Sequence, residues 1–219
     1  MNRFLLVGLA MASMVSGEVP GQTQVDRPQL VVGDRWTFRA VDLQKSEETQ
    51  SYEYRVTGIS GDDVELTRMT LASTTPTDIG KSSVQKVTAA TWTFVNARIL
   101  EGKYVAFAFP LDAGKTWEYE YKYSATDGNP PGTWSVKVKA EGWEEVRVPA
   151  GTFKAMKVVH EGRWSRMFGG YSISGTSIET FWYVPEVKWF AKREYYVRRS
   201  GGIVDSNIRN ELVSRELAK

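Results

Sequence analysis

The stretch "GKTWEYEYKYS", Gly114–Ser124, alternates between aromatic and polar residues. Its aromatic residues occupy every second position: Trp117, Tyr119, Tyr121 and Tyr123. Successive side chains of a β-strand point to opposite faces, so this alternation predicts a half-buried strand with one apolar and one wet face. Strands of this kind are typical of antiparallel sheets, and the stretch therefore favours an all-β protein.

A similar phrase, "GDRWTFRAV", stands eighty-one positions earlier and begins at Gly33. We interpret both copies as the start of a strand, with Gly33 and Gly114 in the preceding turn and Trp36 and Trp117 as anchors of the core. Two later pairs of stretches recur at nearly the same offset: residues 52–56 with 134–138, and residues 61–66 with 143–148. The halves 29–110 and 111–219 are therefore either duplicates of one unit or two units that share a common strand pattern.

Turn-forming residues separate the alternating segments. The loop predicted at Ser124–Thr133 is rich in proline and glycine, and Pro149 and Pro185 each interrupt a strand. The last element, Arg209–Leu217, fits either a helix or a strand, and the preceding "SGG" favours a strand after a hairpin turn. We predict an antiparallel meander that forms a curved sheet, a sandwich or an incomplete barrel, with at most about one short helix.

The N-terminus has the layout of a secretory signal peptide. A short basic start at Arg3 is followed by an apolar run, Phe4–Ala12, and then by small residues. The run breaks at Ser13, which favours a signal peptide over a membrane anchor. We expect residues 1–17 to be removed, so that the mature N-terminus is Glu18.

The mature chain is expected to consist of a flexible leader, residues 18–28, and one β domain, residues 29–219. The full sequence has a formal net charge of +2 with basic and acidic residues interspersed, which disfavours binding to nucleic acid. It contains no cysteine, so we expect neither disulfides nor a lipid-anchored N-terminus. No stretch after the apolar run predicts a membrane span. Together these features predict a periplasmic or secreted protein.

Three motifs of the second half resemble a group of bacterial exported all-β proteins of unknown function. They are "VPAGTF" at Val148–Phe153, "WYVPEV" at Trp182–Val187, and a terminal "EL" followed by a second leucine at Glu211–Leu217. The group's pattern has Gly after the valine of the second motif, where this chain has Lys188. The resemblance implies an all-β envelope protein and brings no catalytic residues with it.

Candidate catalytic groups have structural interpretations. The one histidine, His160, shares a predicted strand face with Met156 and Val158, which favours a structural role over a general base. The acidic pairs Asp62–Asp63 and Glu144–Glu145 are interpreted as solvated turns, because neighbours on a strand face opposite ways and cannot act together. We therefore expect no catalytic residue, no cofactor and no metal site.

The candidate ligand site is the stretch "RWSRMFGGYSISGTS", Arg163–Ser177, which is interpreted as a loop. It is rich in glycine and serine and yet carries four large apolar side chains: Trp164, Met167, Phe168 and Tyr171. Such side chains on a loop form either a lip that binds a ligand or a plug that covers an open end of the core.

Two classes of function follow. The first is an exported, non-catalytic envelope protein that holds an apolar or amphipathic small molecule, or an envelope partner protein, in a curved sheet. The alternative is an extracytoplasmic hydrolase whose carboxylates converge in the fold. The absence of any catalytic motif favours the first class, and an apolar cavity or a cleft of carboxylates would distinguish them.

Overall fold

The computed structural model describes residues 24–95, 98–124 and 129–219. Within these ranges, twelve strands form one antiparallel sheet, and two further strands form a small second sheet. The predicted all-β, antiparallel fold class is confirmed. Two short 3-10 helices occur, η1 (Pro76–Asp78) and η2 (Pro185–Val187), one more than expected. No helix in the described ranges is long and apolar enough to cross a membrane.

The first half of the chain supplies β1 (Gln24–Val25), β2 (Arg35–Asp42), β3 (Glu47–Ser60), β4 (Asp63–Ser73), β5 (Ser82–Thr88), β6 (Thr93–Val95) and β7 (Ile99–Gly102). The second half supplies β8 (Leu111–Asp112), β9 (Thr116–Tyr123), β10 (Gly132–Val148), β11 (Gly151–Phe168), β12 (Tyr171–Val184), β13 (Trp189–Arg199) and β14 (Val204–Glu216).

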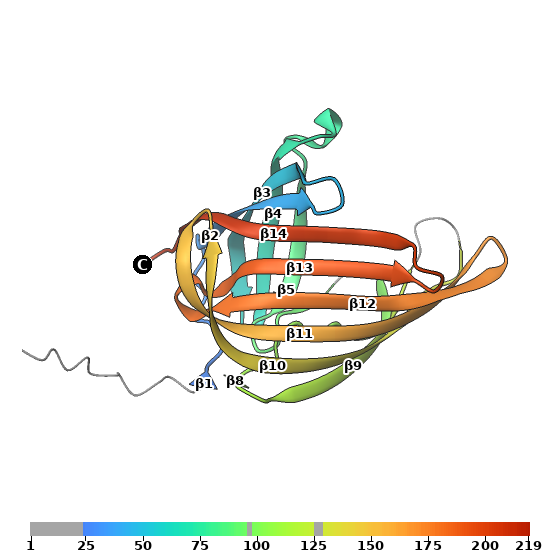
Figure 1. Cartoon of the computed structure of the whole chain (residues 1–219). Coiled ribbons are helices and arrows are strands. Elements are labelled where there is room, and N and C mark those ends of the chain that lie inside the picture. The colour runs from blue at the N-terminus through green and yellow to red at the C-terminus, as the bar shows by residue number, and fades with distance from the viewer. Residues whose placement is uncertain (1–23, 96–97, 125–128) are drawn as a thin grey trace, which may run out of the picture.

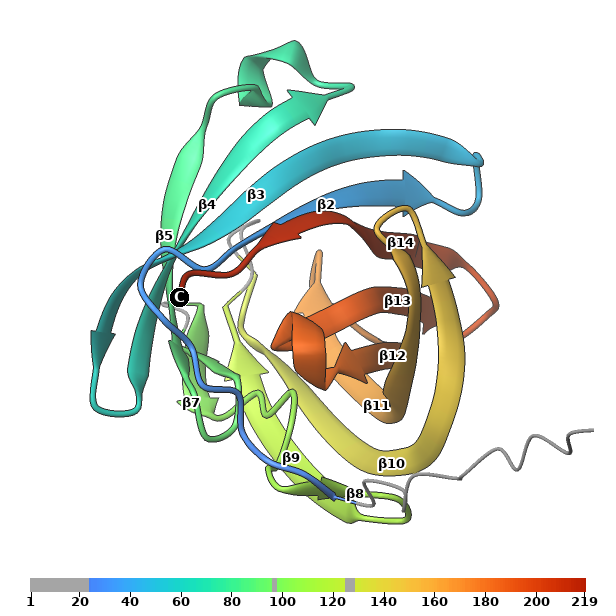
Figure 2. The ribbon, with the colours of Figure 1, turned by 90° about the vertical axis from the view of Figure 1, so that its left-hand side faces the viewer.

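The large sheet joins two meanders through one long-range pairing. Its strand order is β6-β5-β4-β3-β2-β14-β13-β12-β11-β10-β9-β7, so the last strand of the chain lies between β2 and β13 (Figure 1). The register of this seam places Leu212 opposite Phe38, and both side chains are buried. The sheet is strongly curved (Figure 2). Its two end strands, β6 and β7, are consecutive in sequence, so the chain itself brings the two ends of the sheet close together.

The doubled phrase forms two strand starts, as predicted. Gly33 and Gly114 adopt φ angles of 100° and 86°, which glycine tolerates far better than other residues. Trp36 at the start of β2 is fully buried and donates its indole N–H to the carbonyl of Val187 at 2.7 Å. Trp117 at the start of β9 is half-buried, because β9 lies next to the end of the sheet and has less structure above it. Burial is thus weaker at the second copy than expected.

The hairpin of β10 and β11 bends round the neighbouring strands (Figure 2). A register shift at Gly142 in β10 marks the bend, as β-bulges commonly do. Beyond it, Ala150 at the hairpin tip donates its backbone N–H to the carbonyl of Leu212 on β14 at 3.0 Å. The far end of this hairpin therefore covers the outer face of β12–β14, and Trp182 on that face is buried.

This bend corrects the interpretation of one acidic pair. Glu144 and Glu145 lie within β10 and not at a turn, because the strand continues through the bulge to Val148. Glu144 accepts a hydrogen bond from the indole N–H of Trp182 beneath it. Asp62 does lie at the turn between β3 and β4, as expected, and pairs with Arg27.

Aromatic residues fill one end of the interior. Trp92 is fully buried and stacks on Trp189, with ring centroids 4.6 Å apart. Phe107, from the segment between β7 and β8, packs edge-on against Phe181 and Tyr183 at centroid distances of 5.2 and 5.0 Å. The segments that carry Trp92 and Phe107 therefore contribute to the core, although the sequence analysis did not single them out as core segments.

The structure describes only the last part of the N-terminal region about which the sequence analysis makes predictions. The expected signal peptide, residues 1–17, lies outside the described residues. The described end of the expected flexible leader does pack on the fold, because β1 pairs with β8 and Val25 is buried. At the other end of the chain, β14 confirms the strand predicted for residues 209–217, with Gly201 and Gly202 at positive φ in the hairpin turn before it.

Candidate functional site

A cavity of about 400 Å³ lies inside the curved sheet. Tyrosine is the most frequent residue of its lining: Tyr52 and Tyr54 from β3, Tyr119, Tyr121 and Tyr123 from β9, Tyr195 from β13, and Tyr104 from the segment after β7. These residues project inward because they occupy alternate positions of their strands. The volume lies within the range of small-molecule sites in proteins.

One ion pair lies in the wall of this cavity. Arg193 on β13 donates its Nε–H to Glu179 Oε1 on β12 at 2.5 Å. The other carboxylate oxygen, Oε2, accepts the hydroxyl of Tyr104 at 2.8 Å. Burial alone would lower the pKa of Arg193, but the negative charge of Glu179 outweighs it, so the pKa is raised and the guanidinium stays charged.

The guanidinium of Arg193 is open towards the cavity. Its side chain is 32% exposed although the residue lies inside the sheet, whereas the side chain of Glu179 is 6% exposed. Arg193 lies 5.6 Å from the ring centre of Phe181 and 5.3 Å from that of Tyr195. Within the described part of the chain it donates one hydrogen bond, from Nε, which leaves the Nη1 and Nη2 groups as donors for a ligand.

Burial shifts the pKa values of several other polar groups of the wall away from pH 7, towards the neutral forms of these groups. Burial lowers the pKa of His160 from 6.5 to about 4, against the opposing effect of the negative charge of Glu179. The Nδ1 atom of His160 lies 3.0 Å from the hydroxyl of Tyr119. Burial raises the pKa of the hydroxyls of Tyr52, Tyr119 and Tyr195, so they remain protonated. The wall therefore combines aromatic rings and neutral hydroxyls with one charged pair.

A second cavity of about 380 Å³ adjoins the first. The two cavities share Tyr123, Trp134 and Tyr195 in their linings. Trp134 stacks on Trp164 of β11 with ring centroids 5.9 Å apart, and Trp164 belongs to the lining of the second cavity. The charged residues of that lining are Arg98, Arg166, Arg199 and Asp205. The two cavities thus form one trough with aromatic walls.

Of the four predicted site residues, one lines a cavity and three lie away from both cavities. Trp164 is 7% exposed and lies in the wall of the second cavity. Met167, Phe168 and Tyr171 lie at the tip of the β11–β12 hairpin, with Tyr171 79% exposed, and belong to neither cavity lining. The predicted lip and the observed trough therefore have one residue in common.

The interpretation of residues 163–177 as a loop is wrong. The segment belongs to β11 and β12, which are joined at Gly169 and Gly170 with φ angles of 56° and 84°. Two glycines at positive φ make a tight hairpin turn, so the strands continue up to it on both sides. Gly175 is needed in β12, because a Cβ there would lie 2.1 Å from the carbonyl oxygen of Arg198.

The sequence analysis did not identify the tyrosines of the wall or the pair Arg193–Glu179 as site residues. The sequence does contain one indication of this site. In an ordinary core the inward positions of a strand are aliphatic, whereas here several of them are tyrosines or charged residues. Arg193 shares its strand face with Tyr195, and Glu179 shares its face with Phe181. Charged residues are almost never buried without a partner, so an inward Arg and an inward Glu on neighbouring strands predict a pair.

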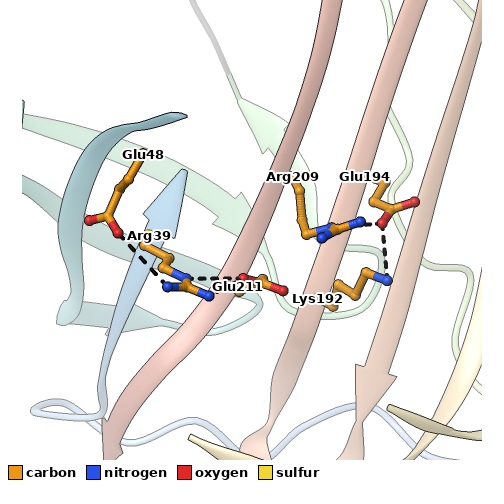
Figure 3. Close-up of polar contacts among 6 residues, drawn as sticks. All are labelled: Arg39, Glu48, Lys192, Glu194, Arg209 and Glu211. Atoms are coloured by element: carbon orange, nitrogen blue, oxygen red, sulfur yellow. Dashed lines mark hydrogen bonds and ion pairs between the residues drawn. The ribbon is translucent and has the colours of Figure 1, made fainter. Parts of the chain in front are cut away.

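A second group of charges lies on the opposite face of the sheet, on β2, β3, β13 and β14 (Figure 3). Arg39 on β2 pairs with Glu211 on β14 at 2.8 Å, and Arg209 on β14 pairs with Glu194 on β13 at 2.9 Å. Burial alone would raise the pKa of Glu194, but hydrogen bonds from Lys192 and Arg209 outweigh it and lower the pKa. Opposite charges across neighbouring strands stabilise pairing, and we interpret this group as a structural ladder along the seam.

Carboxylates are sparse in the trough. Among the described residues, Glu179 is the one carboxylate in the lining of the first cavity, and Asp205 is the one in the second, where it pairs with Arg199. The described residues contain no group of three or more potential metal ligands of the His, Cys, Asp and Glu types. Neither cavity lining, as described, therefore contains the two carboxylates that a pair of cooperating acids requires.

No protein-family model and no curated protein matches the chain. Two solved structures share its fold. A Bacteroides fragilis protein described as exported and as having a YmcC-like fold has a TM-score of 0.53 at 16% identity, over 88% of this chain and 99% of that one. A Parabacteroides distasonis protein described as a lipoprotein has a TM-score of 0.56 at 16% identity, over 88% of this chain and 99% of its own. At this identity the likeness establishes the fold, and the chain has the all-β fold of these two bacterial proteins.

Proposed function

We propose that this protein is an exported, non-catalytic envelope protein that binds a small apolar or amphipathic molecule in its interior cavity. The observation that carries the proposal is the cavity of about 400 Å³ with walls of tyrosine rings inside the curved sheet. A core built for stability alone is packed to the density of an organic crystal, so an aromatic cavity of this size is a default candidate for binding.

Two observations support a location outside the cytoplasm. The expected signal peptide at residues 1–17 is one, and the descriptions of the two fold neighbours, one as exported and one as a lipoprotein, are the other. A partner protein is a weaker candidate for the ligand, because the cavity lies between the inward faces of the strands and not on an exposed face.

The proposal is tested by filling the cavity. Ala106 is buried and belongs to the cavity lining, so Ala106→Phe places a ring in the space. The probe is decanol, a neutral amphipathic molecule, measured by isothermal titration calorimetry. We expect decanol to bind the unmodified protein and to bind Ala106→Phe at least about tenfold more weakly, a difference of about 1.4 kcal/mol.

The matched control is Ala113→Phe, in the exposed turn before β9. It adds the same ring outside the cavity and should leave the affinity for decanol unchanged. Circular dichroism and a denaturant midpoint establish that both variants are folded. Absence of decanol binding by the unmodified protein, or equal binding by both variants, would contradict the proposed function.

A further inference from the structure

We propose that the ligand is a carboxylate with an apolar body, and that its carboxylate is held by the guanidinium of Arg193. This inference rests on the proposed function and adds the chemical class of the ligand. It follows from which hydrogen-bonding groups of the cavity are already occupied and which are open.

Both carboxylate oxygens in the acidic half of the wall already accept a hydrogen bond. Glu179 Oε1 accepts from Arg193, and Oε2 accepts from the hydroxyl of Tyr104. The carboxylate is nearly enclosed, with 6% of its side chain exposed. A ligand that offers a hydrogen-bond donor, such as an amine, would therefore have to displace Arg193 or Tyr104 to reach this acid.

The basic half of the wall is open. Arg193 uses its Nε–H for Glu179, and the hydrogen bonds of the described residues leave the edge formed by Nη1 and Nη2 unused. A guanidinium presents its donors in a fixed planar fork that matches the two oxygens of a carboxylate. The one charged donor of the first cavity is therefore oriented for an anionic acceptor, and its charge is retained because the pKa of Arg193 is raised.

Aromatic rings surround the charged group. The guanidinium carbon of Arg193 lies 5.6 Å from the ring centre of Phe181 and 5.3 Å from that of Tyr195. The rest of the wall is aromatic, which suits an acyl chain or a ring system behind the charged group.

The experiment compares three ten-carbon probes with the same body: decanoate, decanol and decylamine. Each is titrated by isothermal calorimetry at pH 8, where decanoate is ionised. We expect decanoate to bind at least about tenfold more tightly than decanol, and decylamine to bind more weakly than decanol. Decanoate binding no tighter than decanol binding would overturn the inference while leaving the proposed function standing.

A double variant tests the role of Arg193. Arg193→Met combined with Glu179→Gln removes both charges of the pair together, so that no single buried charge is left without a partner, and Gln can still accept from Tyr104. We expect this variant to lose the preference for decanoate, with at least about a tenfold loss of decanoate affinity and an unchanged affinity for decanol.

The same two substitutions on the outer face provide the control. Arg209→Met combined with Glu194→Gln removes a pair of similar length, 2.9 Å, from the structural ladder. Decanoate binding should be unchanged in this control. Equal decanoate affinity in the unmodified protein and in the Arg193–Glu179 double variant would overturn the inference. If none of the three probes binds the unmodified protein, the proposed function fails as well, so the two failures are distinguishable.

Discussion

Lys188 combines an unfavourable backbone conformation with a stabilising ion pair. It follows the 3-10 helix at Pro185 with φ at 62° and ψ at 11°, a left-handed conformation that favours glycine. In this chain the lysine Nζ pairs at 2.8 Å with Asp34, whose side chain is 0% exposed. The ammonium thus compensates a buried carboxylate that also accepts the backbone N–H groups of Val31 and Ala218.

Comparing Lys188→Gly with Lys188→Ala separates these two effects. Both variants remove the partner of the buried Asp34 and should therefore be less stable than the unmodified protein. Only the alanine retains the left-handed strain, so we expect the glycine variant to be more stable than the alanine variant by about 1 kcal/mol. The measurement is the free energy of unfolding in urea. Equal stability of the two variants would show that the conformation at residue 188 carries no strain.

His160 should make stability depend on pH. Its pKa is lowered by burial from 6.5 to about 4, so the unfolded chain binds a proton in this range that the folded protein excludes. The stability contributed by the neutral imidazole is therefore complete above pH 6.5, falls as the pH decreases from 6.5 to 4, and changes no further below 4. Between pH 7 and pH 5 the loss amounts to about 2 kcal/mol.

The control for this prediction is His160→Gln, which removes the one imidazole of the chain. Carboxylates titrate in the same range in both proteins, so their effect cancels in the difference. The free energy of unfolding of the unmodified protein, minus that of the variant, should decrease by about 2 kcal/mol from pH 7 to pH 5. A difference that does not change with pH would mean that the imidazole is hydrated in the folded state.

At the scale of the strands, the two copies of the doubled phrase have the same conformation and different burial. Trp36 opens β2, next to the central seam, and Trp117 opens β9, next to the end of the sheet. We expect Trp36→Ala to cost about 4 kcal/mol of unfolding free energy and Trp117→Ala about 2 kcal/mol. Urea unfolding of the two variants measures the difference. A cost for Trp117→Ala equal to that for Trp36→Ala would show that both anchors are equally enclosed.

The β11–β12 hairpin should respond differently along its length. Phe168 at the tip is 47% exposed, so Phe168→Ser should change the free energy of unfolding by no more than about 0.5 kcal/mol. Trp164, four residues back along β11, is buried against Trp134, and Trp164→Ser should cost about 3 kcal/mol. Denaturant midpoints of the two single variants check this. A large loss from Phe168→Ser would identify the tip as a plug.

Strand alternation explains how much of this architecture could be predicted. The period of two in residues 116–123 predicts the strand and its inward face, and Pro149 and Pro185 predict where β10 and β12 end. Residues 163–177 were misinterpreted because glycine and serine are as compatible with a hairpin as with a loop. The bend of the β10–β11 hairpin depends on contacts with β14, and no local pattern reports a contact between residues so far apart in sequence.

The interior cavity was harder to predict than the strands. The described part of its wall draws on seven strands and on the segment after β7. The pair Arg193–Glu179 forms only when β12 and β13 lie side by side. The sequence analysis predicted a site at the aromatic residues near Gly169 and Gly170. In the structure the first cavity is lined by inward-facing tyrosines instead. Whether the two halves of the chain are duplicates stays a prediction, because matching strand order does not distinguish common origin from common pattern.

At the scale of the whole molecule, the expected signal peptide predicts where the mature chain begins. The segment before Glu18 has the layout of a signal peptide, and β1 begins at Gln24. Removal of residues 1–17 would leave every described strand intact. We therefore expect N-terminal sequencing of the protein from its own host to begin at or close to Glu18. Recovery of a folded protein that begins at Met1 would contradict export by cleavage.

The position of β14 also governs when the molecule can form. β14 follows all other described strands in the sequence, and yet it is an interior strand of the sheet, between β2 and β13. Until residues 204–216 are available, the chain can build at most two separate sheets, β2 to β6 and β7 to β13, each with an unpaired inner edge. Unpaired edges are templates for aggregation, and non-local pairing is slow. A chain that lacks β14 would therefore carry two sheets with exposed, unpaired edges at β2 and β13. We expect such a chain to aggregate through these edges.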